Sequence, residues 1–165
     1  MSEGVRIGRR GTLLLAAGLL GGCGFKLRRP PQLAFRTIAL VGFSPRSPLA
    51  EELRRELLRQ VSVLDDAARA QVVLKALDDA RERSVVASTA AAQVRELQLR
   101  LKFNFRADTP GGRELIPRVE LLLKRDLSYS ETQALAKEAE EAELFREMQA
   151  DVVTQVLRRL AAVQV

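Results

Sequence analysis

The lone cysteine, Cys23, and the many basic side chains are the residues with which this chain could do chemistry. Because the chain has no histidine, Ser-His-Asp catalysis, Cys-His catalysis and imidazole-ligated metal sites are excluded. One cysteine also excludes an internal disulfide and a thiolate zinc cluster. The 27 Lys and Arg residues outweigh the 21 Asp and Glu residues, and the net charge of +6 favours an anionic partner: nucleic acid, a membrane surface or an acidic glycolipid. We therefore predict a binding protein with no catalytic site, metal or cofactor.

The first 22 residues have the layout of a bacterial export signal. Three arginines precede an apolar stretch over residues 12–20, which as a helix would span only about 15 Å, half of a bilayer core. The basic start, the short apolar run and the small residues Gly21 and Gly22 together predict a secretory signal peptide over residues 1–22. The pair Arg9-Arg10 also resembles a twin-arginine export signal, so the general and twin-arginine routes both stay open.

The sequence Leu20-Gly21-Gly22-Cys23 resembles the lipobox of bacterial lipoproteins. The resemblance implies cleavage before Cys23, an S-linked diacylglycerol on its thiol and an N-acyl group on the new amino terminus. Several acyl chains, at about 0.8 kcal/mol per buried methylene, anchor a domain to a membrane without a spanning helix. Because residue 24 is glycine and not the aspartate that favours inner-membrane retention, the expected destination is the outer membrane.

The chain after the signal peptide divides into a tether and one folded domain. Residues 23–34 contain two adjacent prolines and three basic residues, which disfavour helix and sheet and predict an acylated tether. Residues 35–165 are predicted to form a single domain. Runs of β-forming residues predict its first two strands, over 35–43 and 71–77. Residues 78–83 are charged and could either continue the second strand or form a loop.

Two long strands are the clearest elements of the domain. In residues 94–106, the odd positions from 97 onward are apolar and the even positions from 96 onward are polar, which predicts a half-exposed antiparallel strand. Residues 107–112 are predicted to form a turn. After it, residues 115–127 again place apolar side chains on one face and charged side chains on the other. These two segments predict a hairpin. The small residues over 84–92 are predicted to connect it to the preceding strand.

Two amphipathic helices complete the predicted fold. Ser47 is a good N-cap with Pro48 at the first helical position, and a leucine stripe follows, which predicts a helix over 48–61. Apolar residues that recur every three or four positions predict one long helix over 131–163. The order is therefore β-α-β-β-β-α. We predict a two-layer α+β fold, with a four-stranded, mainly antiparallel sheet and two helices on one face.

Three landmarks occur in a familiar order along the chain. They are Cys-Gly-Phe-Lys-Leu-Arg at residues 23–28, Arg113-x-x-Ile116-Pro117 at the start of the last strand, and the stretch from Tyr129 to Met148. In this order they resemble the LptE (RlpB) family of LPS-assembly lipoproteins over essentially the whole chain. The resemblance implies a sheet with two helices on one side and residence as a plug inside the outer-membrane β-barrel LptD, whose assembly the plug assists. It also implies binding of lipopolysaccharide (LPS) on its way to the outer leaflet.

The resemblance also suggests candidate LPS-binding residues. Lys137 stands where the family carries a lysine associated with LPS binding. A second basic position of the family falls in the connection over 84–92, which here has no charged residue. Arg81, Arg83 or Arg95 could compensate for its absence.

A further basic surface follows from the strand pattern. LPS presents phosphates and carboxylates, which Arg and Lys bind through charge-assisted hydrogen bonds. Five basic residues share one strand parity and could form one sheet face: Arg100, Lys102, Arg106, Arg118 and Lys124. Three interpretations of this face stay open: contact with LPS, contact with the polar lumen of the barrel, or an ordinary solvated surface.

Two functions other than the LptE-like one remain as alternatives. One is a different outer-membrane lipoprotein adaptor with an unrelated protein partner. The other is nucleic-acid binding, against which the export signal and the lack of aromatic residues on the polar strand face both argue. The expected location is the outer membrane, with the lipid-anchored domain inside the barrel lumen or facing the periplasm.

Overall fold

The structure of the chain is a computed structural model that describes residues 32–88 and 94–165. The chain divides into two units, residues 1–30 and residues 31–165. The predicted signal peptide, the acylation site Cys23 and most of the predicted tether lie outside the described residues. All described helices and strands belong to the second unit.

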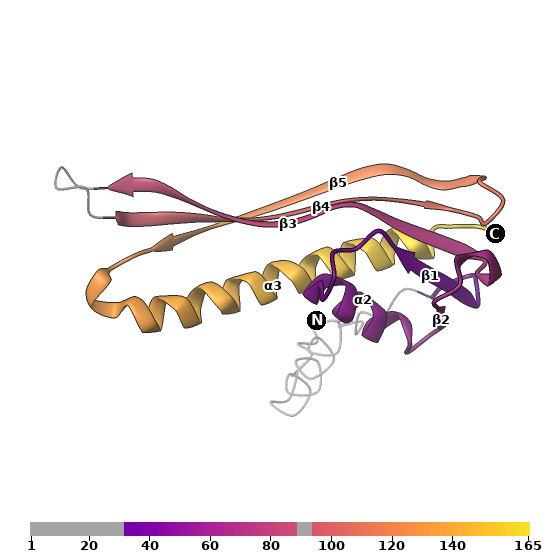
Figure 1. The fold of residues 1–165 in the computed structure, drawn as a ribbon, viewed down its shortest axis with the longest axis horizontal. Helices are drawn as coiled ribbons and strands as arrows, with labels where there is room; N and C mark the ends of the chain where they lie inside the picture. The colour runs from indigo at the N-terminus through magenta and orange to yellow at the C-terminus, as the bar shows by residue number, and fades with distance from the viewer. Residues whose placement is uncertain (1–31, 89–93) are drawn as a thin grey trace, which may run out of the picture. The chain divides into compact units, whose positions relative to one another are not determined.

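The second unit is built on one mixed, five-stranded sheet in the order β2-β1-β3-β4-β5 (Figure 1). Its strands are β1 (Thr37–Val41), β2 (Ser62–Leu64), β3 (Val72–Ser88), β4 (Val94–Asp108) and β5 (Glu114–Ser128). β1 runs parallel to both β2 and β3. β3, β4 and β5 are antiparallel neighbours, so the predicted hairpin of two long strands is confirmed.

Strand β2 corrects the predicted four-stranded sheet to a five-stranded one. It has only three residues, and three residues are too few to show an alternating pattern. Its parallel pairing with β1, in which Thr37 lies opposite Ser62, is what defines it as a strand. The α+β class is confirmed, and the order of elements becomes β-α-β-β-β-β-α.

Two helices, α2 (Pro48–Leu57) and α3 (Ala134–Ala161), lie on the same side of the sheet (Figure 1). α2 begins as predicted, because the Ser47 hydroxyl accepts a hydrogen bond from the Ala50 N–H at 3.1 Å. It ends at Leu57 and not at residue 61, since the chain turns there into β2. A short 3₁₀ turn over Glu131–Gln133 precedes α3, so the regular helix begins later than predicted.

Strand β3 is longer than predicted and changes the side it presents to the helices. It runs through residues 78–83 and on to Ser88, so residues 84–88 are strand and not connection, while residues 89–93 lie outside the described residues. A register shift between Ala76 and Asp78 marks a β-bulge at Leu77. A bulge inserts one extra residue, so the even positions face the helices before it and the odd positions face them after it.

The core lies between the sheet and the two helices. β4, α2 and α3 contribute most of its fully buried side chains, and β1, β3 and β5 contribute Ile38, Leu74 and Leu127. Those from β4, α2 and α3 include Leu99, Leu101, Phe103, Phe105, Leu49, Leu53, Leu57, Met148, Val152 and Leu160. A small second cluster of Ala39, Ala70 and Val73 lies on the opposite face of the sheet. The rest of that opposite face carries mostly polar and charged side chains, together with the exposed Leu122.

Candidate functional site

The sheet face turned away from the helices carries the basic residues predicted as a binding surface. We call it the outer sheet face, and its polar members are Lys75, Asp78, Glu82, Gln98, Arg100, Lys102, Asn104, Arg106, Asp108, Arg118, Glu120, Lys124 and Asp126. In the β4–β5 register, Arg100 lies directly opposite Lys124. Leu101 and Phe103 alternate with these side chains and are buried, so the basic residues point away from the helices. The five predicted basic residues therefore do share one face.

Acidic residues neutralise much of this face. The Lys102 Nζ lies 2.8 Å from a carboxylate oxygen of Asp78, which β3 places beside it. The hydrogen bond to Asp78 and the negative charge of Asp78 raise the pKa of Lys102 above its ordinary value. Glu82 lies opposite Arg100 in the β3–β4 register, and Asp126 belongs to the same face on β5. The outer sheet face is thus a mixed-charge surface and not the basic one that the sequence predicted.

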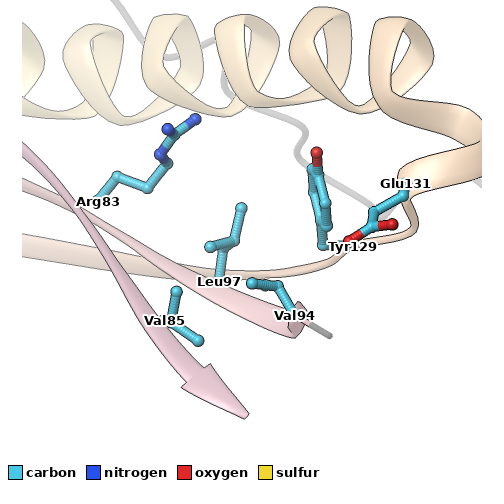
Figure 2. Close-up of a pocket in the computed structure, with 6 residues that line it drawn as sticks. All are labelled: Arg83, Val85, Val94, Leu97, Tyr129 and Glu131. Carbon is cyan, nitrogen blue, oxygen red and sulfur yellow. The ribbon is translucent and has the colours of Figure 1, made fainter. Parts of the chain in front are cut away.

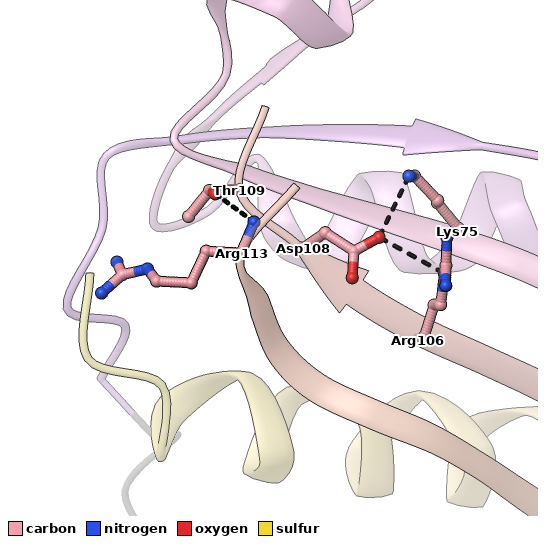
Figure 3. Close-up of polar contacts among 5 residues, drawn as sticks. All are labelled: Lys75, Arg106, Asp108, Thr109 and Arg113. Carbon is pink, nitrogen blue, oxygen red and sulfur yellow. Dashed lines mark hydrogen bonds and ion pairs between the residues drawn. The ribbon is translucent and has the colours of Figure 1, made fainter. Parts of the chain in front are cut away.

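The end of the face nearest the β4–β5 turn is organised around Asp108. Its side chain is buried and pairs with the Lys75 Nζ at 3.0 Å and with the Arg106 Nε at 3.3 Å (Figure 3). The Thr109 hydroxyl then accepts a hydrogen bond from the Arg113 N–H at 3.1 Å, which closes the turn. The Arg106 guanidinium is therefore already paired with the buried carboxylate of Asp108. It is a weak candidate for a ligand contact.

The remaining cations of the outer sheet face lie on or beside β5. The Arg100 Nε donates to the Gln98 Oε1 at 2.9 Å, and the Gln98 Nε2 donates to Asp126 at 3.0 Å, so these three side chains form a chain across the strands. Within residues 32–88 and 94–165, no ion pair involves Arg118 or Lys124. The positive charge that is left over is therefore concentrated on the edge strand.

A pocket lies on the opposite, helix-bearing side, where α3 begins beside the far ends of β3 and β4. Its volume is about 420 Å³, and Figure 2 shows the side chains that line it: Arg83, Val85, Val94, Leu97, Tyr129 and Glu131. The valines, the leucine and the tyrosine ring give it an apolar wall, while Arg83 and Glu131 give it charged margins. We call it the hairpin-end pocket. It combines an apolar lining with a cation, which suits a ligand that has both apolar and anionic parts.

Lys137 is held beside this pocket. Its side chain is only 15% exposed, and its Nζ donates to the Ser128 hydroxyl at 3.1 Å and to Glu140 at 2.8 Å. Ser128 immediately precedes the pocket residue Tyr129. One helical turn further on, Glu141 pairs with Arg83 at 3.3 Å. Lys137 and Arg83 are thus each paired with a glutamate of α3, and Lys137 is positioned more firmly than an ordinary exposed helix lysine.

Of the three arginines considered as substitutes for the missing basic position, Arg83 is the one that lines the hairpin-end pocket. Arg81 has a structural role: its guanidinium lies 5.3 Å from the centroid of the Phe145 ring and donates to the Gln149 Oε1. Gln149 is buried and donates in turn to the Pro48 carbonyl at 3.0 Å, which connects α3 to the start of α2. Arg95 lies next to the pocket residue Val94 on an exposed part of β4.

The apolar lining of the pocket was missed by the sequence reasoning. Val85 lies in the stretch predicted as a connection, and Tyr129 lies between the predicted last strand and the last helix. A signal was present at Val85, because it belongs to a short β-branched pair with Val86, which favours strand over loop. Nothing in the local sequence of Tyr129 indicates that its ring lines a pocket.

In the part of the chain that the structure describes, no helix has the length and apolar character needed to cross a membrane.

Comparison with known proteins gives consistent matches. The family model described as LptE, Lipopolysaccharide-assembly, matches residues 35–160. A protein of Photorhabdus laumondii named LPS-assembly lipoprotein LptE is 31% identical over 157 residues, which cover 92% of this chain and 85% of that protein.

Solved structures match over similar lengths. The solution structure of an uncharacterized lipoprotein B from Nitrosomonas europaea is 28% identical with a TM-score of 0.71, covering 84% of this chain and 91% of that one. The crystal structure of the rare lipoprotein B from Shewanella oneidensis is 26% identical with a TM-score of 0.63, covering 77% of this chain and 95% of that one.

Proposed function

Since the chain belongs to the LptE family of LPS-assembly lipoproteins, we propose that it binds LPS at the hairpin-end pocket and serves as the plug of an LptD-type outer-membrane β-barrel. The observation that carries the LPS part of this proposal is the pocket itself, an open pocket of about 420 Å³ that combines apolar side chains with Arg83, while Lys137 is held next to it. The barrel part rests on family membership and on the resemblance of the sequence.

The two halves of the pocket fit the two halves of the proposed ligand. Lipid A, the membrane-embedded part of LPS, carries acyl chains and phosphates on adjacent parts of one molecule. The side chains of Val85, Val94 and Leu97 offer apolar contact for acyl chains. Lys137 and Arg83 offer charge-assisted hydrogen bonds for phosphates, in exchange for the carboxylates of Glu140 and Glu141 that they contact now.

The proposal places the domain at the outer membrane through a lipid on Cys23. The lipobox over residues 20–23 and the signal peptide before it support this anchor. The expected modification is an S-linked diacylglycerol together with an N-acyl group. Such an anchor leaves the folded unit free to occupy the lumen of a barrel or to face the periplasm, and its role there is to bind and position, without catalysis.

Substitution of Lys137 by glutamate tests the ligand site. Lys137→Glu should weaken LPS binding about tenfold, because it replaces a charge-assisted hydrogen bond by repulsion. The change also removes the ion pair with Glu140, so circular dichroism and a thermal melt of the variant must show a folded domain before its binding is compared. Binding of purified protein to fluorescent LPS measures the effect.

The matched control is Arg146→Glu, the same reversal of charge on the same helix at a side chain that is 69% exposed. It should leave LPS binding unchanged. Equal losses in both variants would indicate a general effect of charge, and unchanged binding in Lys137→Glu would remove this residue from the site.

Purification of the tagged full chain from detergent-solubilised membranes tests the proposed barrel partner. We expect a large outer-membrane β-barrel to co-purify, because a plug inside a barrel is enclosed by its partner. Recovery of the chain alone would count against the plug proposal. Recovery of an unrelated protein in its place would support the alternative of a different lipoprotein adaptor.

A further inference from the structure

Strand β5 has one side without a partner. It is the last strand in the order β2-β1-β3-β4-β5, and within the described residues no strand pairs with its far side (Figure 1). With 15 residues it is among the longest strands of the sheet. A long unpaired edge presents backbone N–H and C=O groups that can pair with an extended segment of another protein.

The register of the sheet tells which residues present these groups. The Tyr129 N–H donates to the Arg95 carbonyl at 2.8 Å, so residues 95 and 129 form a hydrogen-bonded pair. The register then continues without a shift from residues 96 and 128 to residues 105 and 119. In an antiparallel pair these hydrogen bonds recur at every second residue. Odd-numbered residues of β5 therefore direct their backbone groups to β4, and even-numbered ones direct theirs to the free edge.

This edge lacks the features that commonly block strand pairing. Pro117, which has no N–H, lies within the register irregularity at the start of β5, so the edge from residue 118 to residue 126 contains no proline. The Lys124 carbonyl accepts a hydrogen bond from the Arg125 guanidinium at 2.9 Å. A long side chain thus covers one edge group, and it can be displaced by the backbone of a docking strand.

The side chains along the edge carry charges that the domain itself does not neutralise. The even-numbered residues, all of them exposed, are Arg118, Glu120, Leu122, Lys124 and Asp126. In residues 32–88 and 94–165, none of the four charged ones forms an ion pair. Opposite charges directly across a sheet are stabilising and like charges destabilising. A docking strand therefore needs an acid opposite each base of this edge, a base opposite each acid and an apolar residue opposite Leu122.

The proposed plug function identifies where such a strand comes from. A plug inside a barrel is surrounded by its partner, so the partner's backbone is what its edge meets. The wall strands of a closed barrel are already paired on both sides, which leaves a loop or a terminal extension as the docking segment. A second copy of β5 would also match the order of charge, but a plug enclosed by its barrel has no access to one.

We propose that the β5 edge binds an extended loop or terminal extension of the barrel partner by strand addition, as a sixth strand beside β5. Backbone hydrogen bonds to residues 118–126 hold the segment, and the alternating charges of the edge select it. The inference rests on the barrel partnership proposed above and adds the surface through which the barrel is held. It does not involve the hairpin-end pocket.

A proline at residue 122 tests the backbone contact. The Leu122 N–H points to the edge, so Leu122→Pro removes an edge donor and breaks no hydrogen bond to β4. We expect it to lower the amount of barrel that co-purifies with the tagged full chain about tenfold. Leu122→Ala is the matched control, because it removes the same side chain and keeps the N–H, so it should change the recovery by no more than about twofold.

Circular dichroism must first show that the proline variant is folded. A loss of barrel in Leu122→Pro alone supports the proposal. Equal losses in the two variants would mean that only the side chain is used, and unchanged recovery in both would mean that the barrel is held elsewhere. Either result would overturn strand addition.

Photocross-linking in membranes gives a second test that needs no disruptive substitution. The photoreactive residue p-benzoylphenylalanine is placed singly at Arg118, Leu122 or Asp126, which are spaced about 13 Å apart along the strand. The three adducts should map to one segment of the barrel, in order and about four residues apart. Glu82 is the control, since it is exposed on the same sheet face but lies on β3, two strands from the edge. It should not label that segment.

Adducts scattered over several barrel segments, or equal labelling from residue 82, would overturn the proposal in favour of a general contact of the sheet face. Adducts with a second copy of the chain or with a different protein would also overturn it. If the barrel co-purifies but the edge gives no adduct, strand addition fails and the plug function stands. If the barrel does not co-purify with the unmodified chain either, the plug function itself fails.

Discussion

Replacing Phe103 with alanine should lower the free energy of unfolding by about 3–5 kcal/mol, the usual cost of truncating a buried phenylalanine. Phe103 has no exposed surface and lies on β4, the strand between β3 and β5. Its ring stacks on that of Phe105 at 5.2 Å and on that of Phe43 at 5.6 Å between centroids. Because paired strands on both sides hold the backbone, the site cannot collapse to fill the cavity. Chemical denaturation followed by circular dichroism measures the effect.

Leu135→Ala is the control for this prediction. Leu135 is 83% exposed at the start of α3, so its truncation should change the free energy of unfolding by no more than about 0.5 kcal/mol. A loss below about 1 kcal/mol in Phe103→Ala would be hard to reconcile with a fully buried ring. It would mean that the core between the sheet and the helices is not packed as described.

The same burial explains why β4 and β5 could be predicted from sequence. β4 packs one face on the helices and turns the other away, so its odd positions are apolar and its even positions polar, from Leu97 to Phe105. The start of α2 was predictable from local residues, because Ser47 caps the helix and Pro48 occupies its first position. In these segments the buried and exposed positions alternate with the period of the strand or helix, so the sequence pattern shows the element directly.

The second half of strand β3 could not be predicted from an alternating pattern. Past the bulge at Leu77, the positions that face the helices are Asp79, Arg81 and Arg83, whose partners are the polar side chains of other elements. The Ser47 hydroxyl donates to Asp79, and Glu141 of α3 pairs with Arg83. No apolar alternation marks such a strand. Its extent depends on contacts with residues far away in the sequence.

The candidate site was predictable to a similar degree. Alternation correctly placed Arg100, Lys102 and Lys124 on one face, but the acids that balance this face come largely from β3. Asp78 reaches Lys102 only because the bulge shifts the register of β3 by one residue. The hairpin-end pocket likewise arises where three separate segments meet. Neither the balance of charge nor the pocket is encoded in any one stretch of sequence.

Replacing Gly42 with alanine should lower the free energy of unfolding by about 2–5 kcal/mol, because two penalties add. Gly42 follows β1 with φ +80°, in the left-handed region that disfavours any residue with a Cβ. A Cβ at this position would also lie 2.4 Å from the carbonyl oxygen of Ala76, next to the β3 bulge. That oxygen belongs to Ala76, which pairs with Phe105 of β4 and directly follows Lys75, the last β3 residue paired with β1, so it cannot move aside without disturbing both pairings.

Gly112→Ala separates the two penalties. Gly112 has φ +87°, but a Cβ there would meet nothing within 4 Å, so only the left-handed penalty of about 1–2 kcal/mol should remain. Denaturation of both variants should therefore show the larger loss at Gly42. Equal losses would mean that the backbone of β3 yields to the new methyl group. The bulge that turns Asp79, Arg81 and Arg83 toward the helices would then be more adaptable than its pairing with β4 on either side of Leu77 implies.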